Sequence, residues 1–151
     1  MRGDTLIEVL IALAVAVVVI SGITVLGTTS LSNARFVASE DQATKYAQEG
    51  IEIVRQIRNS GYVNFANYNG VYCLGQDATS LGAAGASCTT VNIDNQYIRS
   101  VQIAQNNGCG VNLAHAIVTV SWADGKCAVG TYCHSSKLSS CFSTLPPIPA
   151  P

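Results

Sequence analysis

The chain has 151 residues, of which 48% are hydrophobic and only 11% charged, and its formal net charge is −1. This composition is typical of a domain joined to a membrane segment rather than of an ordinary soluble protein. After residue 58 the only cations are Arg99, Lys126 and Lys137. Three scattered cations cannot neutralise a phosphate backbone, so nucleic acid is not an expected partner.

The first predicted element is an apolar helix close to the N-terminus. Residues 6–26 form a run of 21 residues that carries one charge, Glu8. At about 1.5 Å rise per residue the run spans roughly 30 Å, the thickness of a bilayer's hydrocarbon core. A secretory signal peptide is the alternative, but it would place basic residues, not a glutamate, before a shorter apolar stretch. We therefore expect a single membrane crossing.

Glu8 permits two interpretations. Thr5 and Glu8 have the spacing of a capping box, in which Thr5 caps the helix and the Glu8 carboxylate returns to the Thr5 backbone N–H. A capping box needs no particular residue upstream. Here, however, a short basic leader, Met1-Arg2-Gly3, ends five residues before Glu8.

With that leader, the opening stretch MRGDTLIEV and the apolar helix after it resemble the N-terminus of type IV pilins and pseudopilins. The resemblance covers about the first 26 residues. It implies that a prepilin peptidase cleaves between Gly3 and Asp4 and that the new amino group is methylated. It also implies an assembly role for Asp4 and Glu8, because the Asp4 ammonium can pair with the Glu8 carboxylate of the same or a neighbouring subunit. The family usually has phenylalanine at the position of Asp4.

A second helical segment should follow the membrane segment. Apolar residues recur at three- and four-residue steps with charges between them up to about Arg58, which is typical of an amphipathic helix, and Asn59-Ser60-Gly61 should end it. Because residues 5–58 contain no proline, we expect one continuous helix, weakest at residues 21–30, which are rich in Gly, Ser and Thr. Gly50 inside it predicts close approach of a sheet.

The remaining chain predicts an α+β fold, with the long helix packed on a small antiparallel sheet. Strands are expected near 96–104, 114–122 and 131–142, with Trp122 and the alternate residues before it facing the helix, and His115 facing solvent. The expected organisation is a leader (1–3), a transmembrane or filament-core helix (4–28), an amphipathic helix (29–60), a glycine-rich loop (61–95), a sheet head (96–143) and an extended proline-rich tail (144–151).

All six cysteines lie beyond residue 72, and they include no CxxC pair. This favours disulfides, formed outside the cytoplasm, over zinc or haem. If residues 123–126 begin a turn that sets Trp122 opposite Cys133, then Leu113 faces Phe142 and Cys141 lies beside the turn that carries Cys109. The resulting pairs are Cys73–Cys88, Cys109–Cys141 and Cys127–Cys133.

Together these features predict a structural subunit of a type IV pilus or related filament. It would lie in the cytoplasmic membrane with its head outside, and then assemble with its own copies and other pilins. The alternatives are a pseudopilin of a secretion or DNA-uptake machine and a membrane-anchored extracellular binding domain. We expect no enzyme, cofactor or metal, because no Ser/His/Asp or Cys/His set stands out.

Overall fold

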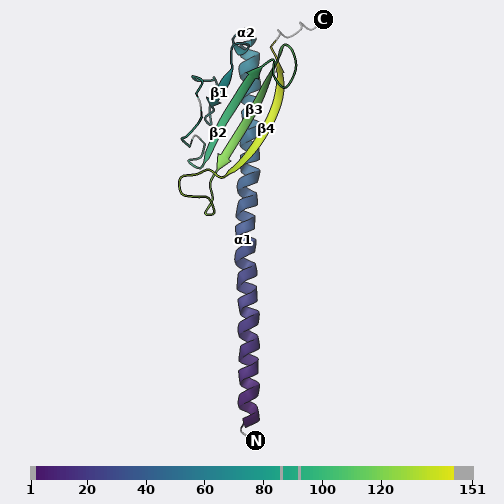
Figure 1. Cartoon of the computed structure of the whole chain (residues 1–151), viewed down its shortest axis with the longest axis vertical. Coiled ribbons are helices and arrows are strands. Elements are labelled where there is room, and N and C mark those ends of the chain that lie inside the picture. Colours follow the sequence, from purple (N-terminus) through teal and green to yellow (C-terminus); the bar gives the residue numbers. More distant parts are fainter. Residues whose placement is uncertain (1–2, 86, 92, 145–151) are drawn as a thin grey trace. The chain divides into compact units, whose positions relative to one another are not determined.

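The computed structural model describes residues 3–85, 87–91 and 93–144, with only the backbone described for 3–5 and 62, and it has an α+β fold (Figure 1). The chain forms two compact units, residues 1–39 and 40–151. The elements are α1 (Gly3–Ser60), α2 (Tyr62–Phe65), β1 (Gly70–Cys73), β2 (Tyr97–Gln105), β3 (Leu113–Trp122) and β4 (His134–Ser143). The expected proline-rich tail lies outside the described residues, except for Thr144.

α1 confirms the prediction of one uninterrupted helix, which includes residues 21–30. The hydroxyl groups of this segment bond back to the helix backbone. Ser21 Oγ donates to the Val17 carbonyl at 2.7 Å, and Thr29 Oγ1 donates to the Val25 carbonyl at 2.9 Å. Such bonds satisfy a polar side chain without water, so this segment can lie in an apolar environment as a helix.

In the second unit the four strands form one antiparallel sheet in the order β1-β2-β3-β4. The residues of α1 from 40 onward lie along one face of this sheet, and α2 lies near the end of the sheet where β2 finishes (Figure 1). β2, β3 and β4 were predicted, and each observed bound lies within three residues of the predicted one. β1 was not predicted, because its four residues fall within the stretch interpreted as a glycine-rich loop.

The predicted register of β3 and β4 is wrong by one residue. Trp122 lies opposite His134, not Cys133, and Leu113 lies opposite Ser143, not Phe142. Directly paired residues point to the same side of a sheet. The observed pairing sets buried Phe142 opposite buried Ala114, whereas the expected one would have set it opposite half-exposed Leu113. Burial of Phe142 therefore accounts for the register.

The core of the second unit lies between α1 and the sheet. Alternate β3 residues are fully or almost fully buried there: Ala116, Val118, Val120 and Trp122, as predicted, and also Ala114. Of the apolar stripe predicted for α1, the members from Ala43 onward are buried except for half-buried Tyr46, whereas the earlier members Leu31, Ala34 and Ala38 are exposed. Gly50 is a point of close approach between α1 and the sheet, because a Cβ on it would lie 2.8 Å from Val118 Cγ1. The expected close contact at Gly50 is thus confirmed.

Candidate functional site

The first candidate site is the start of α1. The helix begins at Gly3, so Thr5 lies inside it and not at its N-cap. This position does not fit the capping-box interpretation, which needs Thr5 just before the first helical turn. Asp4 and Glu8 are both helical and four residues apart, which places them on one face of α1. The Glu8 side chain is exposed, while of Asp4 only the backbone is described.

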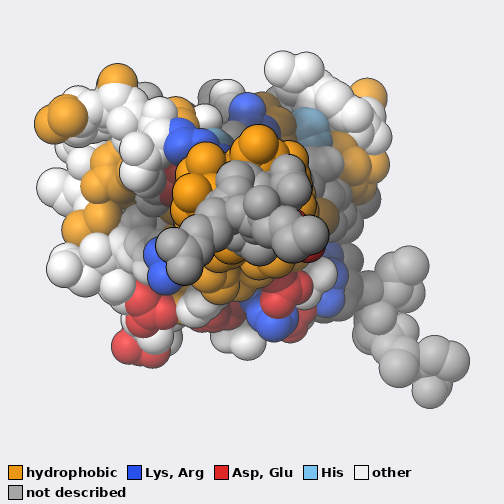
Figure 2. Space-filling view, turned by 90° about the horizontal axis from the view of Figure 1, so that it is seen from below, with side chains coloured by type: hydrophobic (Ala, Val, Ile, Leu, Met, Phe, Trp, Pro, Cys, Tyr) orange, Lys and Arg blue, Asp and Glu red, His pale blue; other side chains and the backbone are white. Residues whose placement is uncertain are grey.

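The helix residues that follow Glu8, from 9 to 20, are all apolar. Large hydrophobic residues from Leu6 to Leu26 are each more than half exposed, and Figure 2 shows such side chains all round the helix seen from its N-terminal end. α1 is therefore long and apolar enough to cross a membrane. A helix that is hydrophobic all round requires an apolar environment that this unit does not itself supply.

The second candidate site is the set of disulfides in the head. The structure contains Cys73–Cys88, Cys109–Cys141 and Cys127–Cys133, which are the predicted pairs. The predicted pairs are correct despite the error in register. Cys127 and Cys133 both lie in the loop that joins β3 to β4, so their pairing does not depend on the register of the strands. Cys141 lies on β4 opposite His115, so the turn between β2 and β3 brings Cys109 within reach of it. His115 is half-buried on the sheet face that points away from α1, where it was expected.

Sequence reasoning missed Arg99, a buried cation of the head. Its side chain is 0% exposed, and its guanidinium donates to the carbonyls of Leu74 (3.1 Å), Gly75 (2.6 Å) and Tyr46 (3.0 Å). Glu49 lies 3.5 Å away, but burial has the larger effect and lowers the pKa of Arg99 below its ordinary value. Arg99 thus joins β2, α1 and the segment after β1.

A local signal for Arg99 was present in the sequence. It occupies the same alternating phase as Tyr97, Val101 and Ile103, all of which are buried on the helix side of β2. A cation in that phase has to find acceptors in the core, because burying an unpaired charge is costly.

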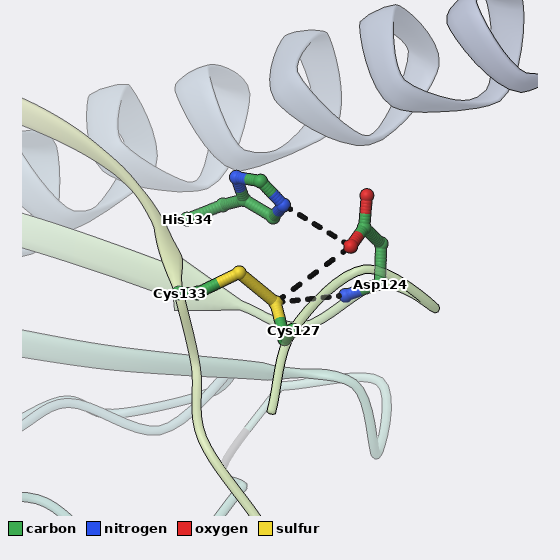
Figure 3. Close-up of side chains that lie close together, drawn as sticks. All are labelled: Asp124, Cys127, Cys133 and His134. Carbon is green, nitrogen blue, oxygen red and sulfur yellow. Dashed lines mark hydrogen bonds and ion pairs between the residues drawn. A yellow bond between two sulfur atoms is a disulfide. The ribbon is translucent and has the colours of Figure 1, made fainter. Parts of the chain in front are cut away.

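The third candidate is a group of metal-ligating side chains in the loop between β3 and β4, which we call the loop cluster: Asp124, Cys127, Cys133 and His134. Figure 3 shows these side chains pointing toward one another. Asp124 Oδ1 lies 3.2 Å from His134 Nε2 and 3.7 Å from Cys127 Sγ. One potential ligand atom from each residue lies within 4.8 Å of all the others.

Backbone bonds hold the loop cluster in place. The Lys126 N–H donates to Asp124 Oδ1 at 2.8 Å, and this bond, followed by the nearby His134, lowers the pKa of Asp124. The Cys127 N–H donates to the Asp124 carbonyl, while His134 is fixed at the first residue of β4 opposite Trp122. With the disulfide intact, neither sulfur is a thiolate, the form in which cysteine binds zinc.

Comparison with known proteins gave no significant match, whether to a family model, to a curated protein or to a solved structure.

Proposed function

We propose that this protein is a structural subunit of a type IV pilus or a related surface filament. The proposal rests on one observation: a glycine that ends a basic leader stands five residues before Glu8, and Glu8 is an exposed carboxylate that is the one charged residue of the apolar run 6–26. In this proposal a prepilin peptidase removes residues 1–3, Asp4 becomes the methylated N-terminus, and the helix stays in the cytoplasmic membrane until assembly.

The charge of Glu8 supports this role. An ionised carboxylate in hydrocarbon costs about 2–4 kcal/mol or more unless it is paired. Cleavage after Gly3 creates an ammonium on Asp4, four residues from Glu8 and on the same helix face. Within the membrane the two charges can pair in one helix. In a filament core the ammonium of one subunit can pair with Glu8 of its neighbour, which would fix the axial register between subunits.

The exposed apolar surface supports assembly through the helix. Side chains such as Leu10, Val18 and Leu26 are 66%, 72% and 72% exposed. Lipid covers them before assembly, and packing against other copies of the helix covers them afterwards. The head would remain outside the packed helices, where its three disulfides are stable in an oxidising environment.

The first test is the N-terminus of the mature protein. The chain should be expressed in cells that have a prepilin peptidase, and its intact mass and N-terminal peptide measured. We expect residues 1–3 to be absent and Asp4 to carry a methyl group. A Gly3→Leu variant should retain the leader, while Gly22→Ala serves as a matched glycine substitution. Met1 retained on the parent protein would contradict the proposal and would favour a plain membrane-anchored binding domain.

A further inference from the structure

The loop cluster has the composition of a metal site that a disulfide now closes. Two sulfurs, one imidazole nitrogen and one carboxylate oxygen form a four-ligand set of the kind that zinc prefers, because Zn²⁺ is borderline-soft and four-coordinate. We propose that the loop cluster binds Zn²⁺ when the Cys127–Cys133 disulfide is reduced by a dithiol. This proposal goes beyond the filament role and does not depend on it.

The distances between ligand atoms fit a tetrahedral site. With metal–ligand bonds of about 2.0–2.3 Å, neighbouring ligand atoms of such a site lie roughly 3.3–3.8 Å apart. Asp124 Oδ1 is already 3.2 Å from His134 Nε2 and 3.7 Å from Cys127 Sγ. The two bonded sulfurs would have to separate to about 3.8 Å, and every other pair of ligand atoms already lies within 4.8 Å.

The backbone should hold these ligands together after the disulfide opens. Asp124 and Cys127 belong to one turn, closed by the hydrogen bond from the Cys127 N–H to the Asp124 carbonyl at 3.1 Å. Cys133 directly precedes His134, whose place at the start of β4 is set by pairing with Trp122. The intervening residues are also held, since the Thr131 N–H donates to the Ala128 carbonyl at 3.0 Å.

Among the three disulfides, this one should be the least costly to open. The paired cysteines lie 6 positions apart in the sequence, against 15 for Cys73–Cys88 and 32 for Cys109–Cys141. A shorter closed loop removes less entropy from the unfolded chain and therefore contributes less to stability. The bond is also accessible, because Cys133 is exposed and Cys127 lines an open recess of about 620 Å³.

The chemistry balances with a dithiol as the reductant. The dithiol supplies two electrons and two protons, the Cys127–Cys133 bond breaks into two thiols, and the dithiol becomes a disulfide. Zn²⁺ then replaces the two thiol protons, which pass to water. His134 binds through a neutral imidazole nitrogen, and Asp124 binds as a carboxylate.

The test uses the full chain in detergent, reduced with dithiothreitol, freed of reductant without air and titrated with Zn²⁺, with Co²⁺ as a spectroscopic probe. We expect one ion per chain, intense tetrahedral and thiolate-to-Co²⁺ absorption bands, and protection of Cys127 and Cys133 from alkylation. Asp124→Asn and His134→Asn should each weaken binding by about tenfold or more, since each removes or weakens one ligand. The oxidised chain should bind far more weakly.

Two controls separate this site from adventitious thiol binding. A Cys73→Ser/Cys88→Ser double variant should bind Zn²⁺ like the parent, and Lys126→Gln should do the same, because Lys126 contributes a backbone N–H to the cluster. Equal binding by parent, Asp124→Asn and His134→Asn would overturn the proposal. So would alkylation of Cys127 and Cys133 at the same rate with and without Zn²⁺, including the case in which reduction unfolds the head.

Discussion

The two units of the chain place their apolar side chains in opposite environments. In the first unit, Leu6 is 67% exposed and Leu26 is 72% exposed, whereas in the second unit Val54 and Val118 are 0% exposed. The second unit has its own core, a sheet and three disulfides. The helix of the first unit depends on its surroundings, lipid or other helices, for burial. Substitutions should therefore act on folding in one unit and on insertion or assembly in the other.

The largest effect on head stability should come from Arg99→Met. The substitution keeps much of the apolar stem but leaves the carbonyls of Leu74, Gly75 and Tyr46 without the donor that they now have. We expect the free energy of unfolding to fall by about 3–5 kcal/mol. Chemical denaturation of the full chain in detergent, followed by the fluorescence of its single tryptophan, measures this. The control is Lys137→Met, because Lys137 is an exposed residue of β4. It should change the free energy of unfolding by less than about 0.5 kcal/mol.

Glycine substitutions compare the two units directly. In a helix, Gly→Ala is normally stabilising by about 1 kcal/mol. A methyl group on Gly27 would have nothing within 4 Å of it, so Gly27→Ala should stabilise α1. At Gly50 the methyl would meet Val118 Cγ1 at 2.8 Å within the core, so Gly50→Ala should lower the free energy of unfolding of the head by about 1–3 kcal/mol. Stabilisation at Gly50 would contradict the close packing of α1 on β3.

A smaller effect should depend on pH at Tyr46. Its hydroxyl donates to the Asp94 carboxylate, which raises the pKa of Tyr46 above its ordinary value. Because the folded state favours the neutral phenol, the bond contributes fully below about pH 10 and is lost as pH rises through the raised pKa. Tyr46→Phe should therefore cost about 1 kcal/mol at neutral pH and progressively less above pH 10.

The partner residue provides the control for that prediction. Asp94→Asn should remove the same alkaline dependence, and the double variant should add little to either single one. A Tyr46→Phe cost that stays constant from pH 7 to pH 11 would show that packing of the ring, which lies 5.3 Å from the Tyr97 ring, is the main contribution.

Local patterns in the sequence predicted much of the fold. The continuous α1 follows from its spacing of apolar residues and lack of proline, and the buried face of β3 follows from strict alternation. The close approach of the sheet at Gly50 could be predicted because a glycine destabilises the middle of a helix, so its presence there suggests that a larger side chain would not fit. These features depend on residues close together in the sequence.

Features that depend on distant partners were missed. β1 has four residues, and its pairing with β2 gives it a strand conformation that its own sequence does not indicate. The register of β4 depends on Phe142 lying opposite Ala114 of β3, on the face of the sheet that is buried against α1. The acceptors of Arg99 come from α1 and from the segment after β1. The loop cluster likewise needed the hairpin to bring Asp124 to His134.

The most direct test of the central claim is Glu8→Gln, compared with the parent by the amount of protein in the membrane and in sheared filaments. Cleavage after Gly3 and membrane insertion should persist, because a neutral amide costs less in hydrocarbon than a carboxylate. Filaments should be lost, since each incoming Asp4 ammonium would be buried without its counter-ion, at a cost on the order of several kcal/mol per subunit. Asp41→Asn, which removes an exposed charge paired with Lys45 on the same helix, should assemble normally. Normal filaments from Glu8→Gln would contradict the pairing role.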